Sequence, residues 1–196
     1  MELSFLTFGY LFLRLAPFIL VCFFTLSSIF NQDFKGFVYL IGLLFACFVS
    51  IMAGRGFDSK DDVNEICKMI TIGGTELTYL PISQCVFGYT FAYMLFAILK
   101  YKMVNNNITS IVFFTLLIVS DMIWNAMNSC YTVVELCVAL IIGGSIGLAW
   151  AYTIDKSNSK NLQYYAGMDN NEVCDKPSAQ TFRCKVYKNG QLISNM

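Results

Sequence analysis

Long apolar stretches alternate with short polar ones up to residue 154, and the chain is mostly polar from Asp155 onward. A helix crosses the hydrocarbon core of a bilayer with about 20 apolar residues. Five stretches have about that length or more: Phe5–Phe30, Phe37–Gly54, Pro81–Leu99, Ile108–Met127 and Val133–Ile154. We therefore predict an all-α polytopic membrane protein, with a transmembrane helical bundle over residues 1–154 and a soluble C-terminal tail over residues 155–196.

The first apolar stretch is too long for one crossing at about 1.5 Å per residue, so we expect Phe5–Leu13 to lie along the membrane interface. The residues before it include Glu2 but no Lys or Arg, which argues against a secretory signal peptide. We interpret this stretch as a retained span.

A short interfacial helix is predicted between the second and third spans. Ser59 with Asp62 three residues later is similar to a capping box. Four apolar positions then follow at helical spacing: Val63, Ile66, Cys67 and Ile70. The acidic residues of this segment lack the spacing of a calcium-binding loop, so we predict a solvated helix face there rather than a metal site.

The distribution of basic residues predicts the orientation, because cytoplasmic loops are enriched in Lys and Arg. One side has Arg55, Lys60 and Lys68, diluted by several acidic residues. The other side has five lysines close to span ends: Lys35, Lys100, Lys102, Lys156 and Lys160. We therefore expect the C-terminal tail on the cytoplasmic side.

Composition supports a membrane protein, since 57% of the residues are hydrophobic, 13% are charged and the mean hydropathy is +0.60. The chain contains no histidine, which argues against most phosphatase-type and metal-dependent chemistry. No CxxC pair is present either, so zinc is unsupported. We predict neither a cofactor nor a metal ion.

Three ionisable residues lie within the predicted spans: Arg14, Asp121 and Glu135. Such a residue costs about 3 kcal/mol at the bilayer centre and usually faces protein or water. One interpretation is an ion or proton path. The other is structural, with Arg14 paired to Asp121 or Glu135, or with positions near the headgroups, and we favour it because Glu135 is close to the start of its span.

Small residues recur every four positions in the fifth span, at Ala139, Gly143 and Gly147. Small side chains let a second helix approach closely. This stripe predicts a helix-packing face, and a glycine hinge for gating is the alternative.

Six of the eight cysteines are interpreted as buried thiols. They comprise Cys22, Cys47, Cys85 and Cys137 in spans, and Cys67 and Cys130 near interfaces. Cys174 and Cys184 in the tail are a candidate disulfide, which would stabilise the tail by about 3 kcal/mol. A reducing cytoplasm argues against that bond.

The tail has a pattern typical of a β-hairpin. Residues alternate from Thr181 to Tyr187, a turn follows at Lys188-Asn189-Gly190, and Gln191-Leu192-Ile193 can return. An isolated hairpin is only marginally stable in water. We therefore expect the tail to dock on a protein partner, with four candidate contact residues: Phe182, Arg183, Lys185 and Tyr187.

A second pattern covers the third to fifth spans. Pro81-Ile82-Ser83-Gln84 opens the third span, and Trp124-Asn125 is followed after five residues by Tyr131 and after three more by Glu135, ahead of the glycine-rich stripe. From Pro81 to about Ala151 the spacing resembles the type 2 phosphatidic acid phosphatase superfamily. That family carries Pro-Ser-Gly-His, then Ser-Arg, five residues, His, three residues and Asp.

In that family one histidine attacks phosphorus, and a second histidine with its carboxylate partner handles the proton. Here Gln84 and Tyr131 stand at the two histidine positions and Asn125 stands at an arginine position, while Glu135 keeps an acid. The resemblance implies a catalytically inactive member. Such a fold joined to a docking tail is similar to virion membrane proteins of large nucleocytoplasmic DNA viruses.

Three functional hypotheses follow. The first is a non-enzymatic structural anchor in a membrane, whose tail docks onto a protein scaffold such as a viral capsid. The second is a lipid phosphatase-like enzyme with an atypical site, and the third is a channel or proton-coupled transporter. We favour the anchor, with the lipid bilayer and scaffold or capsid proteins as partners and no nucleic acid.

Overall fold

The fold was analysed in a computed structural model, which describes residues 5–56, 67, 80–157, 185–188 and 191–195. The chain divides into two compact units, Met1–Tyr164 and Tyr165–Met196. The first unit contains the helices and the second contains the strands.

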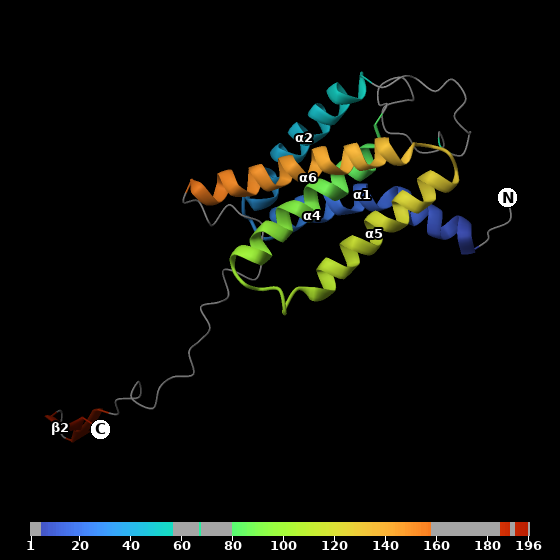
Figure 1. The fold of residues 1–196 in the computed structure, drawn as a ribbon. Coiled ribbons are helices and arrows are strands. Elements are labelled where there is room, and N and C mark those ends of the chain that lie inside the picture. Colours follow the sequence, from blue (N-terminus) through green and yellow to red (C-terminus); the bar gives the residue numbers. More distant parts are fainter. Residues whose placement is uncertain (1–4, 57–66, 68–79, 158–184, 189–190, 196) are drawn as a thin grey trace. The chain divides into compact units, whose positions relative to one another are not determined.

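Five helices make up the described part of the first unit (Figure 1). They are α1 (Phe5–Phe30), α2 (Lys35–Gly54), α4 (Ile82–Lys100), α5 (Ile108–Met127) and α6 (Val133–Lys156). Each is long and apolar enough to cross a membrane. The five predicted apolar helices are confirmed, and their observed bounds differ from the predicted ones by no more than two residues.

Helix α1 continues through Pro17 from Phe5 to Phe30, although a proline inside a helix removes one backbone hydrogen bond. Its candidate span is the 19-residue part Phe12–Phe30. The helical part before Phe12 therefore exceeds what a crossing requires.

Three helices end in the same way. Gln32, Lys102 and Ser129 follow α1, α4 and α5 and adopt φ values of 53°, 55° and 54°. In each case the next residue donates its N–H to the carbonyl five residues earlier, at 2.9–3.1 Å, which is the Schellman arrangement. These terminations give the short connections that turn each helix back along its predecessor.

Helix α4 is the centre of the bundle, because it contacts all four other described helices. Its closest neighbour is α6, which runs beside it in Figure 1. Ala139, Gly143 and Gly147 of α6 are buried at this contact. A Cβ atom at Gly143 would overlap the carbonyl oxygen of Cys85, and one at Gly147 would overlap that of Tyr89. The two backbones therefore approach each other directly.

Buried aromatic residues hold α2 against α4 and α6. The Tyr39 hydroxyl shares a hydrogen bond of 2.6 Å with Thr90 Oγ1, and the Tyr89 hydroxyl donates to the Tyr39 carbonyl at 3.0 Å. Trp150 Nε1 on α6 donates to the Val38 carbonyl at 3.1 Å. The polar atoms of the two buried tyrosines and of the half-buried Trp150 are thus satisfied between helices.

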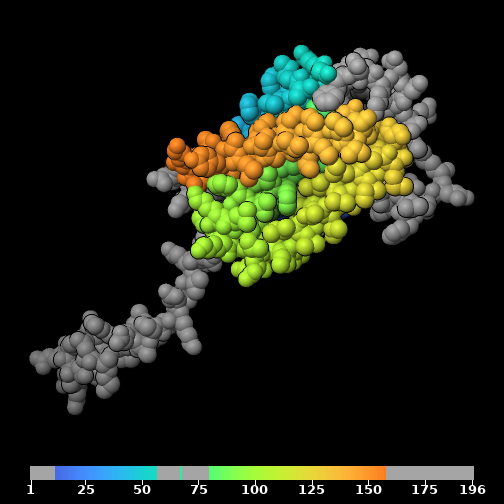
Figure 2. Space-filling view, in the orientation of Figure 1, coloured from blue at the N-terminus to red at the C-terminus, as the bar shows by residue number. Residues whose placement is uncertain are grey.

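Large apolar side chains are exposed on the outer faces of the helices. Examples are Phe23, Leu44, Leu116 and Ile141, each at least 60% exposed. Figure 2 shows α4, α5 and α6 next to one another on one face of the helical unit. An apolar surface of this extent is unfavourable in water and fits contact with lipid.

The second unit contains β1 (Lys185–Lys188) and β2 (Gln191–Asn195), which pair antiparallel with Lys188 opposite Gln191. The register is irregular between Val186 and Tyr187. These strands occupy the segment whose alternation predicts a hairpin. Several predicted features lie outside the described residues: Phe182, Arg183, the Cys174–Cys184 pair, and the interfacial helix of residues 59–70 apart from Cys67.

Candidate functional site

A buried polar cluster lies between the start of α4 and the end of α5. We call it the Asp121 cluster, and it comprises Ser83, Gln84, Asp121 and Asn125. The short connection between α4 and α5 makes the two helices antiparallel, so the first turn of α4 meets the last turns of α5. Asp121 is 1% exposed, and Gln84 and Asn125 are 0% exposed.

The carboxylate of Asp121 accepts two hydrogen bonds from α4. Gln84 Nε2 donates to Asp121 Oδ2 at 2.8 Å, and the Ser83 hydroxyl donates to the same oxygen at 3.2 Å. Gln84 Nε2 also donates to the Ile118 carbonyl at 3.3 Å. Two polar side chains at the start of α4 therefore fix its position along α5.

Asn125 lies one helical turn after Asp121 on α5. Its side-chain nitrogen donates to the Asp121 carbonyl at 2.7 Å, which is a local bond within the helix. Its amide is thereby oriented beside the Asp121 carboxylate rather than toward lipid.

Arg14 of α1 lies next to the Asp121 cluster, over Trp124 of α5. Its guanidinium carbon lies 5.4 Å from the centre of the Trp124 ring, a cation–π distance. Its Nη2 donates to the Cys67 carbonyl at 3.4 Å. The pairing of Arg14 with Asp121 or Glu135, one structural option from the sequence, stays a prediction; the Asp121 carboxylate accepts hydrogen bonds from Ser83 and Gln84.

The interpretation of Cys67 and Cys130 as free thiols was wrong, because they form a disulfide. Their Cα atoms are 5.6 Å apart although 63 positions separate them in the chain. Both lie on the same side of the membrane in the predicted topology, and that shared side was the available sequence signal. The bond holds Cys67 over the turn between α5 and α6, where its carbonyl accepts from Arg14.

Glu135 serves as a helix cap. Its carboxylate accepts from the Thr132 backbone N–H at 2.7 Å, and its own N–H donates to the Thr132 hydroxyl at 3.3 Å. This is a capping box at the start of α6. The Thr-x-x-Glu spacing was visible in the sequence, and Thr132 is a residue that sequence reasoning missed.

Tyr131 lies just before this cap. Burial raises the pKa of its phenol above the usual value of 10.0, and the carboxylates of Glu135 and Asp121 raise it further, while Arg14 lowers it in part. The phenol is therefore neutral at physiological pH. A neutral phenol donates or accepts hydrogen bonds but is a weak nucleophile.

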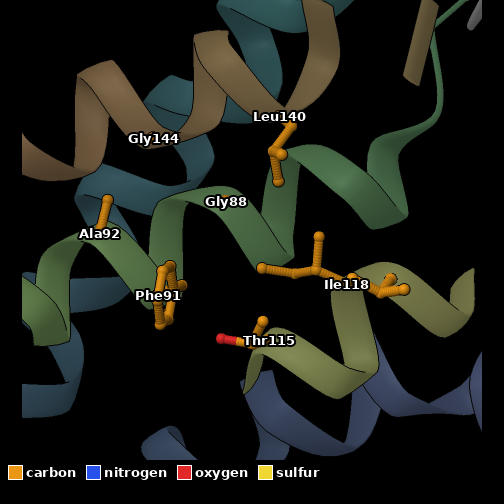
Figure 3. A pocket seen from close by; sticks show the side chains of 8 residues that line it. Gly88, Phe91, Ala92, Thr115, Ile118, Leu140 and Gly144 are labelled. Atoms are coloured by element: carbon orange, nitrogen blue, oxygen red, sulfur yellow. The ribbon is translucent and has the colours of Figure 1, made fainter. Parts of the chain in front are cut away.

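A groove of about 260 Å³ separates α5 from α4 and α6. Figure 3 shows Phe91, Ile118 and Leu140 around it, with Gly88 on α4 and Gly144 on α6. Its one hydroxyl, that of Thr115, donates to the Ile111 carbonyl of its own helix at 2.8 Å. The groove therefore offers apolar surface, distinct from the polar chemistry of the Asp121 cluster.

The structure brings together some of the predicted site residues and separates others. Gln84 and Asn125 meet at Asp121, while Pro81 is the N-cap of α4 and Glu135 caps α6. Among the described residues, no group of three or more His, Cys, Asp or Glu side chains has metal-binding geometry. The arrangement can hold one buried negative charge and link helices by hydrogen bonds.

Five helices that are long and apolar enough to cross a membrane are the feature expected of a polytopic membrane protein. Comparison of the chain with protein-family models, with curated proteins and with solved structures finds no match. The resemblance to the phosphatase superfamily therefore rests on spacing alone.

Replacing Gln84 with methionine is expected to destabilise the bundle by about 2 kcal/mol, because the buried Asp121 carboxylate loses its shorter hydrogen bond. Methionine has a similar volume, so cavity formation contributes little. Thermal unfolding of the purified protein in detergent measures the change. Ser83→Ala is the matched control, since it removes the longer bond from a partly exposed residue, and an equal loss for both variants would contradict this account.

Proposed function

We propose that this chain is a non-enzymatic structural membrane protein, whose helical bundle is an anchor and whose C-terminal tail docks onto a protein scaffold. One observation carries the first half of this proposal. Side chains at the positions that would be catalytic in the phosphatase superfamily are used in hydrogen bonds within or between helices: Gln84, Asn125 and Glu135.

These hydrogen bonds are of the kind that stabilise a bundle. Gln84 links α4 to α5, Asn125 bonds to its own helix, and Glu135 caps α6. An amide cannot form the phosphohistidine intermediate on which that superfamily depends. The neutral phenol of Tyr131 offers no replacement for the second histidine. We therefore expect purified protein to release no phosphate from lipid phosphates, and release that Glu135→Gln abolishes would contradict the proposal.

The tail supports the second half of the proposal. Among the described residues of the tail, the two-stranded sheet of four and five residues has two edges without a paired strand, and such a sheet is marginal alone. Addition of a strand from a partner is a common solution. Lys185 and Tyr187 lie on β1, and they are therefore candidate contact residues together with Phe182 and Arg183, which precede the strand.

The orientation proposed from the lysines has independent support in the Cys67–Cys130 disulfide. Disulfides persist in oxidising compartments. With five spans, the end of the bundle that carries this bond is opposite to the end from which the tail leaves α6. A cytoplasmic tail would then meet a cytoplasmic scaffold, and by analogy with the virion membrane proteins that scaffold would be a capsid.

Cross-linking mass spectrometry of the native assembly tests the docking proposal. We expect Lys185 and Lys188 of β1 to cross-link to one partner protein, and the combined variant R183E/Y187A to lose those cross-links. Lys35, which is on the same side of the bundle in the proposed topology, is the internal control and should not reach that partner. Cross-links from the tail that reach only this chain itself would contradict the proposal.

A further inference from the structure

Two buried oxygen atoms of the Asp121 cluster have no hydrogen-bond partner among the described residues. They are Gln84 Oε1 and Asn125 Oδ1. Both residues are fully buried, at 0% exposure. An unsatisfied buried acceptor is costly and uncommon, so each such atom calls for a physical explanation.

The orientation of the two amides is fixed by what their nitrogen atoms do. Gln84 Nε2 donates to the Asp121 carboxylate at 2.8 Å and to the Ile118 carbonyl at 3.3 Å, while Asn125 Nδ2 donates to the Asp121 carbonyl at 2.7 Å. Exchanging nitrogen and oxygen in either amide would set an oxygen against another oxygen. The two free oxygens therefore belong to amides that lie against Asp121, one on each helix.

Asp121 is the one acidic side chain of the cluster. Asp121 is 1% exposed, and its carboxylate accepts from Ser83 and Gln84, which are neutral donors. Among the described residues, no Lys or Arg lies within ion-pair distance of it. The guanidinium of Arg14 lies over the Trp124 ring and donates to the Cys67 carbonyl, and its charge also acts on Asp121.

We propose that the Asp121 cluster is a binding site for one monovalent cation of the Na⁺ class. The ligands would be the Asp121 carboxylate, Gln84 Oε1 and Asn125 Oδ1. Carboxylate and amide oxygens suit hard cations rather than soft transition metals. A single carboxylate balances a single positive charge, whereas a divalent ion would leave an uncompensated charge in a medium of low dielectric constant.

A cation at this place explains the unusual features together. It would supply a partner for both amide oxygens and a further ligand contact for the buried Asp121 side chain. Because its ligands come from α4 and α5, it would hold these helices together at the end of the bundle that carries the disulfide. The inference goes beyond the anchoring function and does not depend on what the tail binds.

The test is thermal unfolding of the full chain in detergent, with Na⁺ titrated against N-methyl-D-glucamine at constant chloride and constant ionic strength. We expect a saturable rise of about 3 °C or more in Tm, because a ligand that binds only the folded state stabilises it. The Asp121→Asn variant should show no dependence on Na⁺. The control is Asp155→Asn, which removes the same charge from the Lys100–Asp155 pair and should keep the full response.

The Asn125→Leu variant provides a second measurement if Asp121→Asn does not fold. It removes one ligand, and we expect it to raise the half-saturating Na⁺ concentration at least tenfold. A wild-type Tm that is equal in Na⁺ and N-methyl-D-glucamine would overturn the proposal without any variant. Stabilisation by Ca²⁺ but not by Na⁺, or a Na⁺ response that Asp121→Asn keeps, would overturn it as well.

Discussion

Gly143→Ala and Gly147→Ala are each expected to destabilise the bundle by about 3 kcal/mol, although alanine is the better helix former. The gain in helix propensity is about 1 kcal/mol. Against it stands steric overlap, because the new methyl group would collide with the carbonyl oxygen of Cys85 or Tyr89. Both obstacles are backbone atoms, so relief requires α4 and α6 to separate.

Gly144→Ala is the matched control on the same helix. Its Cβ atom would lie 3.8 Å from both the Ala92 Cβ atom and the Gly88 carbonyl oxygen, which is ordinary contact. We expect Gly144→Ala to be neutral or stabilising by up to about 1 kcal/mol. Thermal unfolding of the three variants in the same detergent gives the comparison, and equal stability of all three would contradict the proposed packing.

The positions of the five helices could be predicted because the length of an apolar stretch is a local property of the chain. Hydrocarbon excludes unpaired backbone groups, so each stretch of that length has to be helical. The glycines at 143 and 147 indicated a close helix contact for the same reason, since small residues have few other roles in a span. The helix that packs against these glycines is α4. Its identity could not be predicted, because it depends on packing among segments that are distant in the sequence.

The candidate site was only partly predictable. Asp121 and Arg14 stood out as charged residues in spans, and Gln84 and Asn125 stood out through the phosphatase resemblance. That Gln84 bonds to Asp121 follows from the antiparallel pairing of α4 and α5, which sequence spacing does not give. Ser83 belongs to the Pro81-Ile82-Ser83-Gln84 pattern, but the sequence predicted no role for it.

The disulfide was missed for a similar reason. A bond between Cys67 and Cys130 joins segments 63 positions apart, and no local pattern marks such a pair. Predicted topology put both residues on one side of the membrane, and combining this with the number of cysteines there would have suggested the pair. Their proximity to membrane interfaces instead favoured the interpretation as thiols.

Replacing Cys130 with serine is expected to have the second large effect, a loss of up to about 4 kcal/mol. In the chain-entropy model this is the stabilisation from closing a loop between residues 63 positions apart. The variant also releases Cys67, whose carbonyl accepts from Arg14, so the contact between Arg14 and Trp124 should weaken. Thermal unfolding in detergent, with and without a reducing agent, measures the loss.

Cys137→Ser is the matched control for the disulfide, because Cys137 is a free, half-buried thiol on α6. Without a reducing agent we expect Cys137→Ser to unfold close to the wild-type temperature and Cys130→Ser well below it. A reducing agent should lower the Tm of wild type and of Cys137→Ser toward that of Cys130→Ser, whose own Tm should not change. Maleimide labelling of Cys67 in unreduced wild-type protein would contradict the bond, and with it the independent support for the orientation of the bundle.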